Sequence, residues 1–573
     1  MSIGRGKTDV HLKLSQFSQA MNAGLSPLAA DLLELAAYVY VADQAVTRGG
    51  TKSFDYGDRW HRDLRFTIPV RCPHTWNRSE VRESLRGLLH FLTDDDYEFE
   101  FVPASRAARL DRFLFDTVSP PDDGAVFDEV VLFSGGIDSL CGAVEEVLAG
   151  QHRVLLCSHR PENRVYSRQR ELVSAIRSRL RNPKLAPHHF AATVNKGKKH
   201  NRGFTQRSRS FLFASLATVM ARMFHLDRIR FYENGVTSLN LPISPQMIGG
   251  RASRTTHPQT LWRISRLFSL LFETPFTVEN PFQWHTKPEI LKRLGSLGHS
   301  DLCAGTSSCV NTWQRTEQHP HCGLCSQCVD RRVSVLAATI PTDHDPESRY
   351  ESDVMIGERT GADLLFVERY VGSAYELERF SSVREFAAKF GEIAHVLPYT
   401  GMSADRAAQA IHDLYRRHAT EVSHAIQTVI ASRSGAVMKQ SYPACSLLGA
   451  VVGRTARSRP VVIDPLIAPT ATGPVENRLV IDSERFEVRR GVATCFLGAT
   501  KEFQLIERLH RARAVFLSLD TLREDVWEDS HTEKNTIQRT VSNLRRKLRE
   551  NGVAGVAIEG KQKGHYRLVA SPS

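Results

Sequence analysis

The chain has 573 residues, a formal net charge of +12 and a pI near 9.3. A chain of this length is too long to fold around a single hydrophobic core, so we expect about three or four domains. The N-terminal Met-Ser-Ile-Gly-Arg-Gly-Lys lacks the apolar core of a secretory signal, and no apolar run approaches a membrane span. We therefore expect a cytoplasmic protein without a membrane partner, whose basic charge permits contact with nucleic acid.

Residues 1–125 predict an α+β accessory domain. A helical pattern covers residues 29–40, and alternating apolar residues at 63–70 and 97–101 predict strands of a small sheet. No catalytic constellation stands out in this part of the chain. The stretch 119–124, which contains two prolines, two aspartates and a glycine, predicts a linker.

Residues 126–340 alternate short apolar strands with helices, which predicts a doubly wound parallel sheet. The binding crevice of such an α/β fold lies at the carboxyl ends of its strands. Residues 341–452 predict a helical region. Residues 453–476 carry four prolines and predict a linker, and residues 477–573 predict a separate module.

A glycine loop at residues 134–139 is the most informative feature of this α/β domain. The apolar run 130–133 predicts a buried strand, and a helical pattern starts at Asp138 or Ser139, either of which can cap it. A strand–loop–helix unit directs backbone N–H groups and the positive helix end toward one point, which suits a phosphate. The loop is not the common phosphate loop, because no lysine follows its glycines. The alternative is an ordinary strand-to-helix turn.

Four cysteines are spaced as expected for a metal site. Cys309, Cys322, Cys325 and Cys328 follow the pattern C-x12-C-x2-C-x2-C, and four thiolates make a closed, structural zinc site. The alternatives are free buried cysteines or a redox Cys-x-x-Cys pair. Cys303 is a competing ligand, and His319 and His321 are nearby alternatives.

The loop Ser134-Gly-Gly-Ile-Asp-Ser139 resembles the pyrophosphate loop of the N-type ATP pyrophosphatases. Together with the cysteines it resembles the 7-cyano-7-deazaguanine synthase (QueC) family over about residues 126–335. Further blocks match that family in order. They are Arg209-Ser210 where the family has Arg-Asn, Thr286-Lys287-Pro-Glu289-Ile290, Thr306-Ser-Ser-Cys309 and Cys322-Gly-Leu-Cys325-Ser-Gln-Cys328-Val-Asp-Arg331.

The resemblance implies a pyrophosphatase-type α/β fold, structural Zn²⁺ and an AMP-forming ligase. Such an enzyme adenylates 7-carboxy-7-deazaguanine with ATP, and ammonia displaces AMP to build an amide and then a nitrile. Arg209 and Lys287 would neutralise charge in the transition state, although each has the alternative of an ordinary surface cation. Asp138 would place Mg²⁺ or cap the helix. The implied catalytic residues are Ser134, Asp138, Arg209 and Lys287, and the implied ATP-binding residues are Ser134, Gly135, Gly136, Ile137, Asp138 and Ser139.

One departure leaves the acceptor open. The Tyr-Pro-Asp-Cys-Arg segment of the free-standing synthases is missing, and the polar, basic stretches 233–242 and 249–258 stand in its place. In this the chain resembles the QueC-like proteins of anti-phage operons, especially the QatC type, which also have an extra N-terminal domain. The acceptor of the activated carboxylate is then ammonia or an amine on a partner protein.

The module 477–573 resembles the OmpR/PhoB winged helix-turn-helix. Its last helical pattern sets an apolar stripe from Ile537 to Leu548 against a basic face, which suits a helix lying on DNA phosphates. The alternative is a winged helix that binds a protein. The resemblance implies duplex-DNA contacts by Gln538, Arg539, Ser542, Asn543 and Arg546, with Lys561 or Lys563 on the wing, and the basic face adds Arg545.

Two other functions compete with the AMP-forming ligase. An ATP-dependent tRNA-modifying or thiolating enzyme would need a catalytic cysteine outside the zinc set, and Cys303 and Cys157 are the candidates. A DNA-binding regulator would use the α/β domain only to sense nucleotide. The intact loop at 134–139 argues against the regulator.

Overall fold

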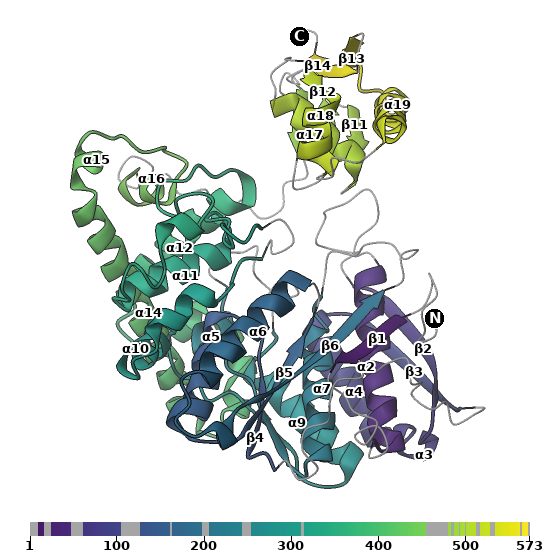
Figure 1. Ribbon diagram of the computed structural model, residues 1–573, viewed down its shortest axis with the longest axis vertical. Helices are drawn as coiled ribbons and strands as arrows, with labels where there is room; N and C mark the ends of the chain where they lie inside the picture. Colours follow the sequence, from purple (N-terminus) through teal and green to yellow (C-terminus); the bar gives the residue numbers. More distant parts are fainter. Residues whose placement is uncertain are drawn as a thin grey trace. The chain divides into compact units, whose positions relative to one another are not determined.

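The computed structural model divides into two compact units, which are treated separately; the described residues up to 453 belong to the first and those from 479 onward to the second. Figure 1 colours the chain from the N-terminus to the C-terminus. The predicted linker, except its first residue, lies outside the described residues. The structure describes residues 10–15, 25–46, 61–104, 126–160, 163–196, 206–242, 254–310, 315–453, 479–482, 486–491, 493–498, 500–511, 516–527, 533–561 and 564–570.

A six-stranded sheet forms the centre of the first unit, in the order β1-β6-β5-β4-β7-β8. Strands β4 to β8 are parallel, whereas β1 pairs antiparallel with β6 at one edge. The expected mixed α/β architecture with parallel strands is thereby confirmed. The strands are β1 (Val10–Ser15), β4 (Glu129–Leu132), β5 (Val154–His159), β6 (His188–Lys196), β7 (Arg228–Arg230) and β8 (Thr277–Glu279).

Helices cover both faces of this sheet (Figure 1). Val131 and Phe133 pack into a core with α5, α6, α10 and α11, whereas Val130 and Leu132 face a core that contains α2, α4, α7 and α9. The alternation follows from the two-residue period of a strand, which makes a strand buried on both faces apolar throughout. The helices are α2 (Pro27–Ala45), α4 (Ser79–Thr93), α5 (Ile137–Val144), α6 (Asn163–Arg177), α7 (Arg209–Met223), α9 (Pro258–Phe272), α10 (Lys287–Ser296) and α11 (Ser326–Ala337).

The N-terminal segment shares its core with this sheet, which differs from the expectation of a separate domain at 1–125. β1 extends the central sheet, and α2 and α4 lie in one hydrophobic core with α7 and α9. The expected small sheet is present as the parallel pair β2 (Asp63–Val70) and β3 (Asp96–Pro103), with α3 (Pro73–Trp76) and α4 between them. α2 is buried around most of its circumference, so it needs partners on more than one side.

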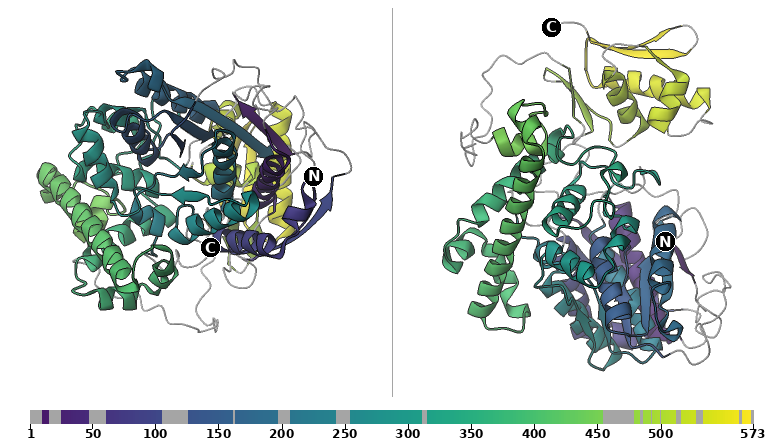
Figure 2. Two further views of the ribbon diagram at one scale, coloured as in Figure 1. Left: turned by 90° about the horizontal axis from the view of Figure 1, so that it is seen from below. Right: turned by 60° about the vertical axis from the view of Figure 1, so that its left-hand side comes forward.

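The helical region 341–452 packs against the zinc-motif helix α11. Its longest helix, α14, lies against α11 and α12 and is drawn in green in Figure 2. These helices and the four cysteines belong to one core. A short helix, α8, follows β7 and also contacts α14. The bounds are α8 (Gly235–Leu239), α12 (Gly361–Leu377), α13 (Val383–Lys389), α14 (Ala404–Ser432), α15 (Ser434–Met438) and α16 (Leu447–Val452).

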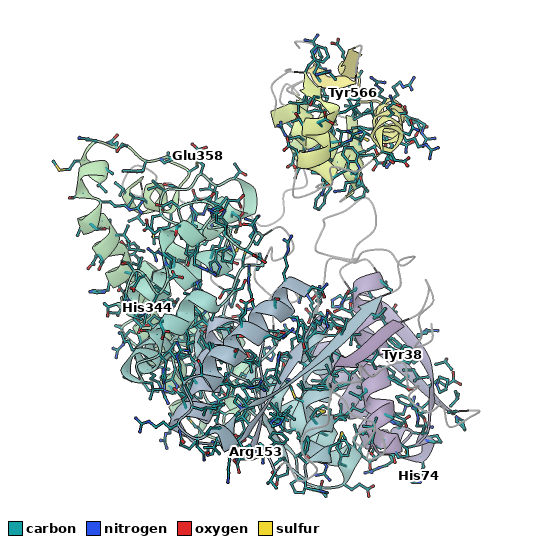
Figure 3. The ribbon with its side chains drawn as sticks, in the orientation of Figure 1. Tyr38, His74, Arg153, His344, Glu358 and Tyr566 are labelled. Atoms are coloured by element: carbon teal, nitrogen blue, oxygen red, sulfur yellow. The ribbon has the colours of Figure 1, made fainter. Side chains whose placement is uncertain are left out.

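The second unit contains two three-stranded sheets and three helices around its own core. Tyr566 on β14, labelled in Figure 3, is buried in that core. No helix in the described parts of either unit is long and apolar enough to cross a bilayer. The elements are β9 (Leu479–Asp482), β10 (Glu487–Arg490), β11 (Ala493–Phe496), α17 (Lys501–Arg511), β12 (Leu517–Ser518), α18 (Leu519–Leu522), α19 (Lys534–Glu550), β13 (Val556–Lys561) and β14 (His565–Ala570).

Candidate functional site

The glycine loop lies where the strand order reverses. Strands β5 and β6 follow β4 in the chain and lie on one side of it within the sheet. Strands β7 and β8 come next in the chain and lie on the other side of β4. Because β4 and β7 are parallel neighbours, the segments after them start at the same edge and diverge. Such a switch point is the usual ligand site of an open α/β sheet.

Gly135 allows the sharp turn between β4 and α5. Its φ of +83° lies in the left-handed region, which a residue with a side chain rarely adopts. α5 begins at Ile137 with Gly136 as its N-cap, so the expected caps Asp138 and Ser139 lie inside its first turn. No side chain caps this end of α5, which leaves its first N–H groups available to an anion.

Two serine hydroxyls flank these N–H groups. Ser134 Oγ and Ser139 Oγ are 3.0 Å apart, and the Gly136 N–H donates to Ser134 Oγ at 3.3 Å. The Gln169 side chain on α6 donates to the Ser134 carbonyl at 3.1 Å and supports the loop from behind. The loop is therefore held in one conformation by hydrogen bonds within the protein.

Asp138 ties the loop to the segment after β7. Its Oδ2 accepts hydrogen bonds from the Asn234 backbone N–H at 3.1 Å and from Asn234 Nδ2 at 2.7 Å. Its other oxygen, Oδ1, is buried and accepts no hydrogen bond within the described residues. A buried carboxylate oxygen of this kind suits a cation, so the residues fit the expected Mg²⁺. Asn234 falls in the stretch 233–242, which replaces the family's substrate segment, and its contact with the glycine loop was not predicted from the sequence.

Lys287 faces Asp138 from the start of α10. Its Nζ lies 3.9 Å from Asp138 Oδ1 and 2.6 Å from Asp330 Oδ2. Burial alone would lower the pKa of Lys287, but the carboxylates of Asp138, Asp330 and Glu233 outweigh it and raise that pKa. Lys287 is only 8% exposed and is therefore not an ordinary surface lysine.

Glu233, the first residue of the stretch 233–242, also belongs to this site, a role that was not predicted from the sequence. Burial raises its pKa well above the usual value, and the neighbouring Asp138 raises it further. Glu233 therefore belongs to the same charged cluster as Asp138 and Lys287, since the pKa of Lys287 responds to it as well. It follows an apolar strand in the same way as Asn234.

Arg209 lies apart from this cluster, at the start of α7. Its guanidinium is 5.7 Å from the Phe213 ring centre. Burial and the charge of Arg209 together lower the pKa of His159, the last residue of β5, to about 4. Within the described residues no hydrogen bond or ion pair joins Arg209 to Asp138 or Lys287. The structure brings together three of the four predicted catalytic residues, and the fourth lies near the end of the adjacent strand.

The two candidate nucleophilic cysteines are both buried. Burial raises the pKa of Cys157, and burial raises the pKa of Cys303 to about 11. A catalytic thiol needs a lowered pKa and access to its substrate. Neither cysteine meets these conditions.

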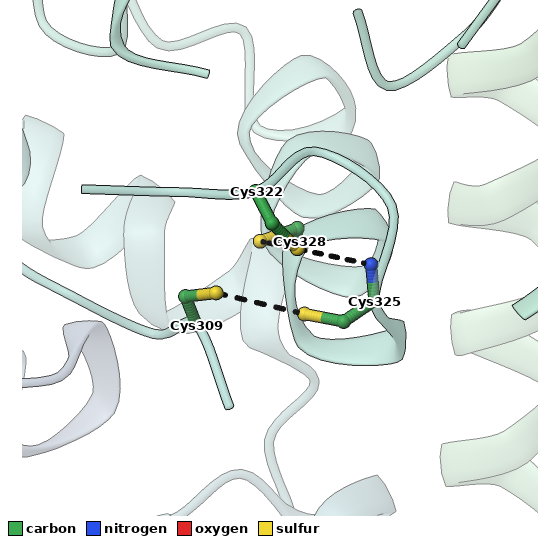
Figure 4. Close-up of side chains that lie close together, drawn as sticks. All are labelled: Cys309, Cys322, Cys325 and Cys328. Atoms are coloured by element: carbon green, nitrogen blue, oxygen red, sulfur yellow. Dashed lines mark hydrogen bonds between the residues drawn. The ribbon is translucent and has the colours of Figure 1, made fainter. Parts of the chain in front are cut away.

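The four predicted cysteines form one buried cluster that can hold a metal ion such as zinc (Figure 4). Their sulfurs all lie within 4.8 Å of one another, with 3.8 Å between Cys322 and Cys328 and 4.0 Å between Cys309 and Cys325. Zinc at about 2.3 Å from each sulfur of a tetrahedron separates the sulfurs by about 3.8 Å, so the residues fit this metal. Cys303 and the two nearby histidines do not belong to the cluster.

Two residues of the cysteine motif explain its local geometry. Gly323 has φ +80°, and a Cβ there would lie 1.8 Å from the Ser352 carbonyl oxygen, so only glycine fits. Arg331 is fully buried and donates to Asp345 at 2.7 Å and to Thr306 Oγ1 at 2.5 Å. The motif thereby joins the cysteines to the segment that returns toward the glycine loop.

The second unit has a helix suited to a DNA groove. The apolar stripe of α19 is buried, whereas Arg539, Ser542, Asn543 and Arg546 are exposed and Gln538 is half-buried. Residues 496–568 match the family model described as "Transcriptional regulatory protein, C terminal". The second unit contains a transcription-regulator winged helix. No curated protein matches the chain.

One predicted DNA contact in the winged helix has a structural role. Arg545 donates from Nε and Nη2 to the Ile558 carbonyl, at 2.9 and 2.6 Å, and so ties α19 to β13. It is half-buried, whereas Arg539 and Arg546 are exposed. The contacts of Arg546 are long, to Asn543 at 3.5 Å and to Glu550 at 4.0 Å. Lys563 and the side chain of Lys561 lie outside the described residues. The exposed face of α19 suits duplex DNA through its arginines.

Proposed function

We propose that the protein is an ATP-dependent, AMP-forming C–N ligase of the 7-cyano-7-deazaguanine synthase type, built on a pyrophosphatase-type fold. One observation carries the proposal. The uncapped N-terminus of α5, the two serine hydroxyls and the buried Lys287 all meet at the switch point of the sheet. This arrangement suits the β- and γ-phosphates of ATP, since it combines backbone donors, hydroxyl donors and one cation.

The reaction then runs in two steps. A carboxylate oxygen of the substrate attacks the α-phosphorus, and the bond to the bridging oxygen breaks as pyrophosphate leaves. The loop N–H groups, Ser134 and Ser139 hold the pyrophosphate, and Lys287 stabilises its developing charge. Bound Mg²⁺, for which Asp138 offers a free oxygen, would neutralise part of the triphosphate charge. An amine next attacks the acyl carbon and displaces AMP.

The resemblance of residues 126–335 to the QueC family supports a 7-carboxy-7-deazaguanine substrate and, through the QatC type, a role in anti-phage defence. Ammonia or an amine of a partner protein would be the acceptor. In the stretch that replaces the family's substrate segment, Thr256 and Ser238 share a hydrogen bond of 3.0 Å. Residues 249–253 of that stretch lie outside the described residues.

The products of ATP cleavage test this proposal. The full chain is incubated with Mg²⁺, ATP, 7-carboxy-7-deazaguanine and ammonia, and the nucleotides are separated by chromatography. We expect AMP and pyrophosphate, with turnover lost in Ser134→Ala and Asp138→Ala proteins that keep the wild-type circular dichroism spectrum. Release of ADP would overturn the proposal. Mass spectrometry of candidate partner proteins identifies an amine acceptor.

The match of residues 496–568 supports a second candidate, a DNA-binding regulator with a nucleotide-sensing core. It predicts that ATP changes the affinity for duplex DNA while no AMP forms. The thiolating alternative is less well supported, because burial raises the pKa of both candidate cysteines. DNA binding titrated with and without ATP, beside the product assay, distinguishes the regulator from the ligase.

A further inference from the structure

Asp330 is the closest partner of the lysine that faces the glycine loop. Asp330 Oδ2 lies 2.6 Å from Lys287 Nζ, whereas Asp138 Oδ1 is 3.9 Å from the same nitrogen. Asp330 lies on α11, two residues after the cysteine ligand Cys328. Helix α11 therefore supplies the shorter of the two carboxylate contacts of Lys287.

Two aromatic side chains of the helical region interact with Asp330, whose own side chain is 20% exposed. Tyr370 on α12 and His418 on α14 meet edge to face, with ring centres 6.1 Å apart. Burial raises the pKa of Tyr370 well above its usual value, and the charge of Asp330 raises it further. Burial also lowers the pKa of His418, on which the charges of Asp330 and Lys287 act in opposite directions. The ion pair is thus placed where solvent screens it little.

The helical region also holds the other end of this lysine. Lys287 is the first residue of α10, which has a capping box formed by Thr286 and Glu289. Arg417 of α14 bonds to Glu289 Oε1 at 2.8 Å and to the Trp284 carbonyl at 2.8 Å. Contacts from outside the strand–loop–helix unit therefore hold both ends of Lys287: α14 holds the start of its helix, and Asp330 on α11 holds its ammonium group.

We propose that Asp330 is a positioning residue, which fixes the Lys287 ammonium toward the glycine loop so that its charge meets a bound pyrophosphate. A lysine side chain has four rotatable bonds, and a carboxylate at hydrogen-bond distance restricts it to one orientation. The helical region contributes to this positioning, because Tyr370 and His418 interact with Asp330 and Arg417 contacts the start of α10. The inference rests on the proposed function only in taking pyrophosphate as the ligand.

A double-mutant cycle on the full chain tests the proposal, with Mg²⁺ and inorganic pyrophosphate as the calorimetric probe. We expect Asp330→Asn to weaken pyrophosphate binding by about 10- to 100-fold, as for other residues that orient a functional group. In a Lys287→Met background the same change should have less than about a twofold effect, because the group it orients is gone. Asp330→Glu should restore part of the affinity.

Equal losses in both backgrounds would overturn the proposal, as would failure of the wild-type chain to bind pyrophosphate. Asp343→Asn is the matched control, since Asp343 is exposed and follows α11. Zinc content checks the fold of each variant, and Asp330→Glu completes the cycle if Asp330→Asn does not fold. Coupling without AMP formation would keep the positioning role and overturn the ligase. AMP formation without coupling between Asp330 and Lys287 would support the ligase and overturn the positioning role.

Discussion

Arg417 and Glu289 form an ion pair that joins the helical region to the start of α10. Arg417 Nε lies 2.8 Å from Glu289 Oε1, and the other carboxylate oxygen accepts the Thr286 N–H at 2.9 Å. One carboxylate therefore serves as helix cap and as interdomain contact. The residue after Thr286 is the lysine that faces the glycine loop, so this contact acts on the candidate site from outside it.

Replacing Arg417 should weaken the site more than it weakens the fold. A partly exposed ion pair is worth under about 1 kcal/mol, and the bond to the Trp284 carbonyl adds about 1 kcal/mol. We expect Arg417→Met to lower the melting temperature slightly and to weaken pyrophosphate binding in calorimetry. Arg416→Met is the control, because Arg416 pairs with Asp413 on α14 itself at 3.6 Å. Equal effects of the two variants on pyrophosphate binding would contradict this prediction.

The glycine loop should not tolerate a side chain at Gly135. Alanine there adopts a left-handed conformation at a cost of about 1–2 kcal/mol, and its Cβ would lie 3.2 Å from Gln169 Cγ. We expect Gly135→Ala to abolish ATP binding. Gly298→Ala is matched for strain, with φ +78° and nothing within 4 Å of its Cβ, and should reduce stability alone. Calorimetric titration with ATP, alongside thermal unfolding, separates the two effects.

The cysteine cluster should contain one zinc ion when the protein is freshly purified. Cys322→Ser removes one of four thiolates, and we expect it to lower the free energy of unfolding by at least about 2 kcal/mol. Cys445→Ser is the control, because Cys445 is half-buried and outside the cluster. Elemental analysis measures the metal, and a chelator should reproduce the loss of stability in the wild-type chain. A wild-type protein without any metal would refute the prediction.

DNA binding by the winged helix should depend on its exposed arginines. Arg539→Ala and Arg546→Ala should each reduce the slope of log affinity against log salt concentration by about 0.9. Arg545→Ala should instead destabilise the contact between α19 and β13, by about 1–2 kcal/mol for its bonds to one carbonyl. Arg508→Ala is the control, because Arg508 lies on α17 and pairs with Asp525 at 2.7 Å. Fluorescence anisotropy with a random-sequence duplex measures each slope, and unchanged slopes would favour the protein-binding alternative.

Stability of the first unit should fall in mild acid through its buried histidines. Burial, together with the charges of Arg254 and His395, lowers the pKa of His257 to about 3. Between pH 6.5 and about pH 3, His257 is protonated in the unfolded chain but neutral in the folded chain. The free energy of unfolding therefore falls by about 1.4 kcal/mol for each pH unit in this range. His257→Asn keeps an acceptor for the Gln259 N–H and should flatten this fall by one proton. Urea unfolding from pH 7.5 to 4.5 measures it, with the exposed His74→Asn as control.

Local patterns were sufficient for the features whose residues are close in the sequence. The strand–loop–helix unit at residues 129–144 follows from an apolar run, two glycines and a helical period. The cysteine cluster follows from ligand spacing, and the amphipathic helix α19 follows from an apolar stripe opposite a basic face, whereas the winged helix was expected from its resemblance to the OmpR/PhoB domain. In the first three cases a few neighbouring residues carry the whole signal, and in all four the structure or the family match agrees with the prediction.

Contacts between distant segments changed the details. Gly136, rather than Asp138, is the helix cap, because the helical backbone already begins at Ile137, and the Asp138 carboxylate accepts a hydrogen bond from Asn234 instead. Arg545 lies on the basic face of its helix, yet a carbonyl of the wing binds its guanidinium. A side chain on a predicted face can still be used by a neighbouring element, and periodicity carries no information about that neighbour.

The amino-acid sequence by itself determined the parallel sheet, the glycine loop and the four-cysteine cluster, since each depends on local spacing and hydrophobic period, and a family resemblance within the sequence indicated the winged helix. Only the tertiary structure decided what surrounds the loop. Lys287, Asp330 and Asn234 come from different elements and meet because α10 and α11 pack on one face of the sheet and β7 lies beside β4. The order of strands and the packing of helices create this site. Contacts between residues so far apart in the sequence cannot be predicted from hydrophobic periodicity, which reports only on neighbouring residues.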